Sequence, residues 1–196
     1  RSGVRSVQFS PNSHRILTAS EDGIAKLWTI EGQLLATLQG HEAGILDATW
    51  SPNGELIITA SKDGKIKLWN GKGENLLTLK GHEAAVNAVV FSTDGNFFAT
   101  ASEDMTIKLW GKDGKLLQTL GGIETGFKSL SFNANGQVLS SSDTEGNVIF
   151  WTLDFDLTPE KLLKEGCLCL QDYLKTSAEV TATDRKLCDR IEEIMF

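Results

Sequence analysis

Two sets of residues in this chain carry the side chains of a nucleophilic hydrolase site. The first set is His41, Ser61 and Asp63, and the second is His82, Ser102 and Asp104, each residue 41 positions after its counterpart. In such a site the serine hydroxyl attacks the substrate, the histidine accepts the proton, and the carboxylate orients the imidazole. An enzyme rarely carries its active site twice at a fixed spacing, so we favour a structural role for both sets.

The same spacing of 41 residues runs through most of the chain. It separates one column of tryptophans, Trp28, Trp69, Trp110 and Trp151, and a second aromatic column, Phe9, Trp50, Phe91 and Phe132. Residues 40–80 and 81–121 align without a gap and are identical at 18 of 41 positions. A constant period of this length is the signature of a repeat architecture.

Each repeat reads as four short strands separated by turn residues, with no helix inside the unit. In the second repeat we expect strands at 45–50, 56–60, 65–69 and 75–79. The second of these is almost entirely apolar, which predicts cover on both faces. The third alternates polar and apolar residues, as a half-exposed strand does. The fourth is the most polar and is expected to lie outermost.

The repeats resemble the WD40-repeat family, whose units open with Gly-His, close with Trp-Asp and form four-stranded blades around a central channel. Gly40-His41 and Gly81-His82 match the opening. The closing pairs lack the aspartate and read Trp28-Thr29, Trp69-Asn70, Trp110-Gly111 and Trp151-Thr152. The resemblance implies an all-β fold in which residues 1–153 form four repeats of an incomplete β-propeller.

The resemblance also implies what the two hydrolase-like sets do. In that family a histidine, a serine or threonine, an aspartate and the tryptophan form a buried hydrogen-bonded network that locks the blade. The matching residues are His41, Ser61, Asp63 and Trp69 in the second repeat, His82, Ser102, Asp104 and Trp110 in the third, and Ser20, Asp22 and Trp28 in the first. In the fourth repeat Ile123, Asp143 and Glu145 replace the polar residues, so we expect its network to be broken.

The loops of one rim of the repeats carry mostly acidic side chains: Glu21, Glu42, Lys62, Glu83, Glu103 and Glu124. In the resembling family such loops commonly receive proteins or peptides. An acidic cluster attracts a basic partner through its field. An ordinary solvated rim that keeps the protein soluble carries the same charges, and both interpretations stay open.

Composition narrows the function further. The chain has 196 residues, a formal net charge of −7 and interspersed lysines and arginines, which argues against nucleic-acid binding. It has no apolar run of about 20 residues and no apolar signal segment, which predicts a cytoplasmic protein away from membranes. The three cysteines form no CxxC pair, and we expect no metal, no cofactor and no enzymatic activity.

Residues 154–196 differ in character and are expected to form a helical tail. Thr158-Pro159 is a helix start, and apolar residues recur at helical spacing from there to Lys175; a second helix is expected near Thr183. The tail either packs on the propeller or docks another chain. Because the tail follows the third strand of the fourth repeat, we expect the outer strand of that repeat and further blades to come from sequence upstream of Arg1.

The tail resembles the endings of large bacterial signalling proteins, notably cyanobacterial ones, that combine a STAND-type NTPase with a WD-repeat sensor. The segments that carry this likeness are Gly166-Cys167, Asp172-Tyr173-Leu174-Lys175 and Arg185-Lys186-Leu187-Cys188. The leading hypothesis is a non-catalytic protein-interaction scaffold or sensor. The alternatives are a purely structural partial repeat array, and the regulatory region of an NTPase whose activity lies upstream.

Overall fold

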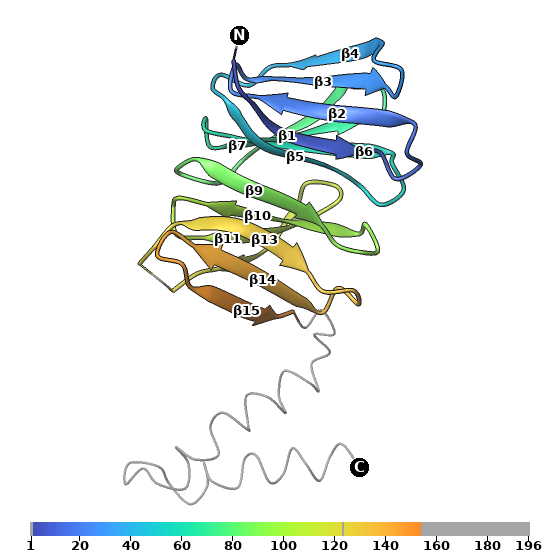
Figure 1. Ribbon diagram of the computed structural model, residues 1–196. Coiled ribbons are helices and arrows are strands. Elements are labelled where there is room, and N and C mark those ends of the chain that lie inside the picture. Colours follow the sequence, from blue (N-terminus) through green and yellow to red (C-terminus); the bar gives the residue numbers. More distant parts are fainter. Residues whose placement is uncertain (1, 123, 154–196) are drawn as a thin grey trace, which may run out of the picture. The chain divides into compact units, whose positions relative to one another are not determined.

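A computed structural model describes residues 2–122 and 124–153, and every regular element in these ranges is a β-strand (Figure 1). The expected all-β fold is therefore confirmed for this part of the chain. The helices expected after residue 158 lie outside the described residues. Within the two described ranges, no helix is long and apolar enough to cross a membrane.

Within residues 2–122 and 124–153, fifteen strands form four antiparallel sheets, and within each sheet neighbours in sequence are neighbours in space. The first sheet contains β1 (Val4–Phe9), β2 (Arg15–Ser20), β3 (Ile24–Thr29) and β4 (Leu34–Gln39). The second contains β5 (Ile45–Trp50), β6 (Leu56–Ser61), β7 (Lys65–Asn70) and β8 (Asn75–Lys80). The third contains β9 (Val86–Phe91), β10 (Phe97–Ser102), β11 (Ile107–Gly111) and β12 (Leu116–Leu120). In the fourth, the described strands are β13 (Phe127–Phe132), β14 (Val138–Asp143) and β15 (Val148–Thr152).

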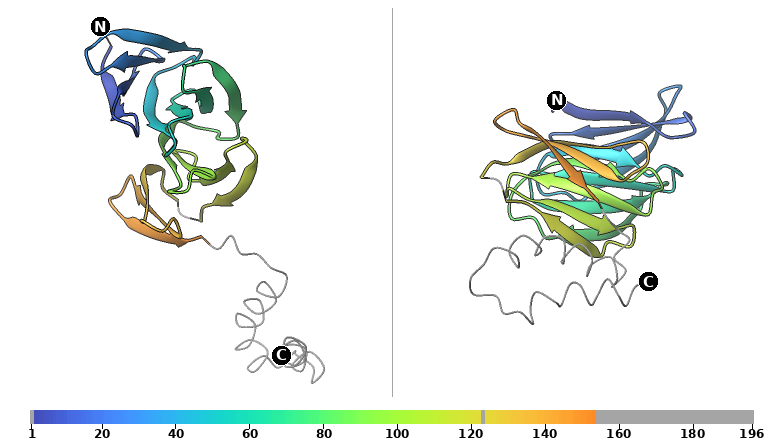
Figure 2. Two further views of the ribbon diagram at one scale, coloured as in Figure 1. Left: turned by 90° about the vertical axis from the view of Figure 1, so that its right-hand side faces the viewer. Right: turned by 90° about the horizontal axis from the view of Figure 1, so that it is seen from below.

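The four sheets follow one another around an arc, as Figure 2 shows. Their first strands, β1, β5, β9 and β13, contact one another in that order. Each of these inner strands contains a β-bulge at the same point of the repeat, at Arg5, Leu46, Asn87 and Lys128. A bulge re-aims a side chain at a strand end, and three of these four residues reach a neighbouring loop or sheet through their side chains.

Three apolar clusters hold consecutive sheets together. The first joins sheets one and two, the second joins sheets two and three, and the third joins sheets three and four. Because β6 and β10 have a sheet on each side, all their residues except the first are buried. The cover predicted for both faces of residues 56–60 is thus confirmed. In β2 and β14, at the two ends of the array, fully buried and less buried residues alternate.

Candidate functional site

A chain of hydrogen bonds crosses the interior of the second sheet. The indole Nε1 of Trp69 donates to Oγ1 of Thr59 at 3.0 Å, and Thr59 Oγ1 lies 2.8 Å from Nε2 of His41. Nδ1 of His41 lies 3.0 Å from Oδ2 of Asp63, which also accepts the backbone N–H of Glu42 at 2.9 Å. The imidazole is fully buried. This chain therefore runs from the tryptophan of β7 to the backbone of the rim residue Glu42.

The third sheet repeats the chain atom for atom. Trp110 Nε1 donates to Thr100 Oγ1 at 2.9 Å, Thr100 lies 2.8 Å from His82 Nε2, and His82 Nδ1 lies 2.8 Å from Asp104 Oδ2. Asp104 Oδ2 accepts the backbone N–H of the next rim residue at 3.0 Å. In this sheet the hydroxyl of Thr106 also donates to Asp104 Oδ1 at 2.6 Å. Both sheets thus fix a rim loop from beneath.

The hydroxyl in each of these two hydrogen-bond networks belongs to a threonine, which corrects the sequence-based assignment of Ser61 and Ser102. Ser61 Oγ instead donates to the carbonyls of Ala43 and Gly44 and accepts the backbone N–H of Asp63. The serine lies at the end of its strand, where it binds backbone, whereas the residue two positions earlier lies within reach of the indole. The column Thr18, Thr59, Thr100 and Ser141, each ten residues before a tryptophan, was the signal that could have found it.

Buried surroundings set the protonation states of the network. Burial lowers the pKa of His41 and of His82 below the ordinary value, and the neighbouring carboxylate opposes this only in part. Burial acts to raise the pKa of Asp63, but hydrogen bonds from the Glu42 backbone and from His41 lower it overall. A neutral imidazole that donates from Nδ1 and accepts at Nε2 satisfies every partner.

The buried hydrogen-bond networks cannot supply a nucleophile and a general base for catalysis. The side chains of His41 and His82 have no exposed surface, and Thr59 and Thr100 are fully buried. Neither serine hydroxyl contacts a histidine. A substrate would have no path to these atoms, so we interpret the network as structural support. Within the described residues, no group of histidine, cysteine or acidic side chains could hold a metal ion.

The end sheets carry reduced versions of the network. In the first sheet Trp28 Nε1 donates to Thr18 Oγ1 at 2.9 Å, Ser20 Oγ donates to the Gly3 carbonyl, and Asp22 accepts the backbone N–H of Ile24. These residues stabilise the turn between β2 and β3. Ser20 and Asp22 therefore contribute locally, and Trp28 bonds a threonine as its counterparts do.

In the fourth sheet an aspartate takes over part of the network. Trp151 Nε1 donates to Ser141 Oγ at 2.8 Å, while Asp143 accepts the hydroxyl of Thr125 and two N–H groups of Asn147. The bond from the Asn147 side chain is the largest of the effects that lower the pKa of Asp143, to about 2. The carboxylate therefore stays charged and holds the turn. Ile123, at the histidine position, lies outside the described residues.

The six candidate rim residues are all exposed and come from the β2–β3, β6–β7 and β10–β11 turns and from the connections between sheets. Three of the glutamates have a cation beside them. Arg5 Nη1 lies 3.6 Å from Glu21, Lys65 Nζ 2.6 Å from Glu42, and Lys128 Nζ 3.4 Å from Glu103. In the described part of the chain, no ion pair reaches Glu83, Glu124 or Lys62. The acidic field of this rim is therefore partly neutralised from within.

One rim residue has an unfavourable backbone conformation. Met105, in the β10–β11 turn, has φ of 66°, in the left-handed region that costs a side chain about 1–2 kcal/mol. The same position of the other three repeats is Gly23, Gly64 and Gly146, all with positive φ. The Met105 side chain is 46% exposed. The third repeat thus presents an apolar side chain at a position where the others have glycine.

Comparisons with known proteins agree with this architecture. The family model for "WD domain, G-beta repeat" matches residues 1–29, 32–70, 73–111 and 114–152. The last three matches each begin at or just before an outer strand of one sheet and end with the tryptophan strand of the next, so each sequence unit joins two sheets.

Individual relatives match a shorter segment of the chain. The chain is 52% identical over 44 residues to WD repeat-containing protein 86 of Homo sapiens, and 40% identical over 45 residues to WD repeat-containing protein slr1409 of Synechocystis. These segments cover 22% and 23% of this chain, and only 12% and 14% of the relatives. The period, the four sheets, the two buried histidine networks and the four family matches together place the chain in the WD40 repeat family.

Proposed function

We propose that this chain is a non-catalytic scaffold or sensor that binds a partner protein at the rim around Met105 and Glu83. Repeats of this family generally mediate protein–protein interactions. The observation that carries the proposal is the strained, exposed Met105. Strain of this kind tends to occur at binding sites, and methionine is common on surfaces that bind other proteins because it is flexible and polarisable.

The charge next to Met105 supports the same location. Glu42 and Glu83 occupy equivalent positions, and an aspartate holds the backbone of each. The Glu42 carboxylate is paired with Lys65, but the counterpart of that lysine is Thr106, which donates inward to Asp104 instead. Since no cation among the described residues pairs with the Glu83 carboxylate, we expect a basic group on the partner beside its apolar contact with Met105.

Two exposed aromatic residues support a further part of the proposal, in which this chain acts together with other blades of the same polypeptide. Phe9 is 62% exposed and Phe150 is 72% exposed, although their counterparts Phe91 and Leu109 are buried against neighbouring sheets. Additional WD sheets would cover both. The signalling context, including an NTPase elsewhere in the polypeptide, stays part of this proposal, and a WD-repeat relative in Synechocystis supports it only weakly.

The test is affinity capture of partners from a lysate of cells that express the protein, read by quantitative mass spectrometry. We expect a saturable partner that binds the wild-type chain, is lost with Met105→Gly, and is weakened by Glu83→Lys. The matched control is Asn135→Lys, which adds the same type of charge in the turn between β13 and β14, on the opposite rim.

Met105→Gly separates binding from folding, because the substitution relieves backbone strain. A variant that is more stable yet loses the partner supports a binding role for the side chain. Equal capture by the wild type and both rim variants would contradict the proposed location, and the absence of any saturable partner would favour a purely structural array.

A further inference from the structure

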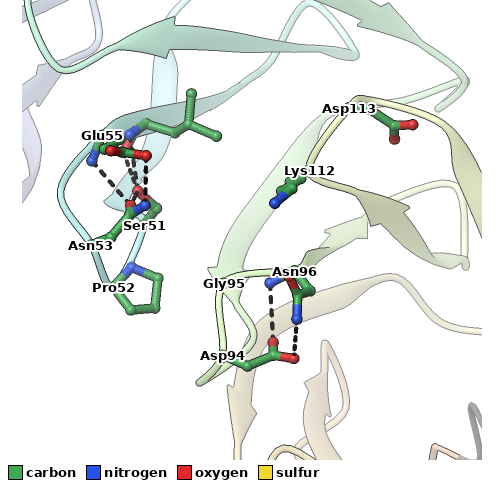
Figure 3. Close-up of a pocket in the computed structure, with 10 residues that line it drawn as sticks. Ser51, Pro52, Asn53, Glu55, Asp94, Gly95, Asn96, Lys112 and Asp113 are labelled. Carbon is green, nitrogen blue, oxygen red and sulfur yellow. Dashed lines mark hydrogen bonds between the residues drawn. The ribbon is translucent and has the colours of Figure 1, made fainter.

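A cleft lined by polar and apolar groups opens between the second and third sheets (Figure 3), on the rim opposite Met105. It has a volume of about 670 Å³. Its walls come from the β5–β6, β9–β10 and β11–β12 turns, and its lining includes Glu55, Leu56, Asp94, Asn96, Lys112 and Asp113. Figure 3 shows Glu55 with Asn53 on one wall and Asp94 with Asn96 on the other. We call this the large cleft.

The first and second sheets form an equivalent but smaller cleft of about 400 Å³. Its lining residues are Ser10, Pro11, Asn12, Arg15, Trp50, Asn53 and Gly54. All of these except Trp50 have a counterpart 41 positions later in the lining of the large cleft. The two clefts are therefore the same feature of the repeat, and a difference in their sequences explains their difference in size.

That difference is an arginine. In the small cleft, Arg15 Nη1 donates to the backbone carbonyl of Gly71 in the β7–β8 turn at 2.6 Å, so its guanidinium bridges the two sheets. In the large cleft the counterpart of Arg15 is Leu56, and the counterpart of Gly71 is Lys112. Leu56 is too short and has no donor to span this gap. The space filled by a guanidinium in one cleft is thus open in the next.

The lining of the large cleft is suited to a cation. Glu55, Asp94 and Asp113 contribute three carboxylates, against the single ammonium of Lys112. The side-chain amide of Asn53 donates to Oε2 of Glu55, and the backbone N–H of Lys115 donates to Oδ1 of Asp113. Both oxygens of Asp94 accept hydrogen bonds, from Ser92 and Asn96, whereas the second oxygen of Glu55 and of Asp113 receives none from the described residues. Acceptors, an apolar patch at Leu56 and room for a side chain therefore occur together.

We propose that the large cleft is a socket for an arginine side chain of a partner protein, which binds where Arg15 binds in the small cleft. The inference rests on the proposed protein-binding function but uses the opposite rim. Arginine fits because its planar guanidinium offers five donors to carbonyl and carboxylate oxygens and is weakly hydrated. Its methylene stem packs on apolar surface, here that of Leu56.

The test is a nuclear magnetic resonance titration of the full chain with Nα-acetyl-arginine amide. We expect saturable shifts of the backbone amides of Asn96 and Asp113. Nα-acetyl-citrulline amide has the same shape without the charge, and we expect it to bind about ten-fold more weakly because it cannot form charge-assisted hydrogen bonds. Equal shifts with both probes, or none at these amides, would overturn the proposal.

Substitutions provide the second arm of the test. Leu56→Arg should place an intramolecular guanidinium in the large cleft, as Arg15 does in the small one, and abolish the shifts. Leu56→Met, which keeps an apolar side chain, should retain them. Asp113→Asn keeps the acceptor for Lys115 but removes the charge, so it should weaken binding even if Leu56→Arg does not fold. Glu83→Gln, on the other rim, should leave the titration unchanged.

The two proposals fail in distinguishable ways. If arginine amide binds but no partner protein is captured, the socket exists without the proposed function. If a partner is captured through Met105 and arginine amide does not bind, the socket is wrong and the proposed function stands. Unchanged binding in Leu56→Arg would show that the probe binds elsewhere and would also refute the socket.

Discussion

Leu109 and Phe150 occupy the same position in the third and fourth repeats, yet Leu109 is fully buried and Phe150 is 72% exposed. Leu109 lies in the cluster between the third and fourth sheets, with Phe127 and Leu139. Phe150 points to the far side of the fourth sheet, where no described sheet lies. In this fold, therefore, a residue is buried where the next sheet along the array packs over it. A hydrophobic side chain alone does not ensure burial.

The polar networks of these two sheets differ for the same reason. The third sheet encloses His82, Thr100 and Asp104 between two neighbours, and every donor and acceptor of the set has a protein partner. In the fourth sheet Trp151 is only partly buried and bonds Ser141 alone. A sheet with two neighbours can enclose a histidine, because the hydrogen bonds compensate for the loss of water. In a sheet with one neighbour, the polar groups rely more on hydrogen bonds to solvent.

The largest expected effect comes from truncating the paired residues of this comparison. Leu109→Ala should lower the free energy of unfolding by about 2–5 kcal/mol, because it leaves a cavity between two sheets. Phe150→Ala should change it by less than about 0.5 kcal/mol, since the ring is already in solvent. Denaturant unfolding of the two variants measures both values. A large loss in Phe150→Ala would show that something covers this face in solution.

The next effect is on the buried hydroxyl. Thr100→Val keeps the shape but leaves Trp110 Nε1 and His82 Nε2 without a partner, at about 1–3 kcal/mol for each buried group. Ser141→Ala orphans only the indole of Trp151, which is near solvent, so the loss should be about 1 kcal/mol or less. Ser102→Ala is the matched control, because the sequence pattern predicts this serine as the hydroxyl of the network. If Ser102→Ala costs more than Thr100→Val, the threonine does not connect the chain.

The sequence was sufficient for the strands but not for all of the site. Period and alternation predicted the strands of the second repeat to within a residue or so and the burial of β6, because both follow from local pattern and from repetition. Ser61 was wrongly assigned to the network in place of Thr59. The two hydroxyls lie on the same face of the strand, and only the position of the neighbouring indole distinguishes them. The ion pairs Arg5–Glu21 and Lys128–Glu103 depend on bulged inner strands, which no local pattern specifies.

A smaller, pH-dependent effect should distinguish the histidine-bearing sheets from the fourth. Burial lowers the pKa of His41 and His82 in the folded state, so below about pH 6.5 the unfolded chain binds more protons than the folded chain. Stability should therefore be full above that pH and decrease as the pH falls, by at most about 1.4 kcal/mol per pH unit for each histidine. Thermal unfolding between pH 8 and pH 5 measures this slope.

The variant His82→Asn identifies the source of that slope. It should be less stable at neutral pH, because Asn cannot bridge Thr100 and Asp104, but its stability should decrease less steeply with acid. The exposed His14→Gln is the matched control and should keep the wild-type slope. An unchanged slope in His82→Asn would show that His82 is not the source of the acid sensitivity in this range; carboxylates such as Asp104, whose folded pKa is lowered, lose their stabilisation only at lower pH.

The smallest effect concerns Met105 and Gly146, which occupy the same turn position in the third and fourth sheets. Met105→Gly should raise the free energy of unfolding by up to about 1 kcal/mol, because it relieves a left-handed conformation and the half-exposed side chain contributes little to the core. Gly146→Met, with φ of 90° at present, should lower it by about as much. Denaturant midpoints of the two variants measure the pair. If Met105→Gly is instead destabilising, the side chain stabilises the fold, and its strained conformation does not indicate a binding site.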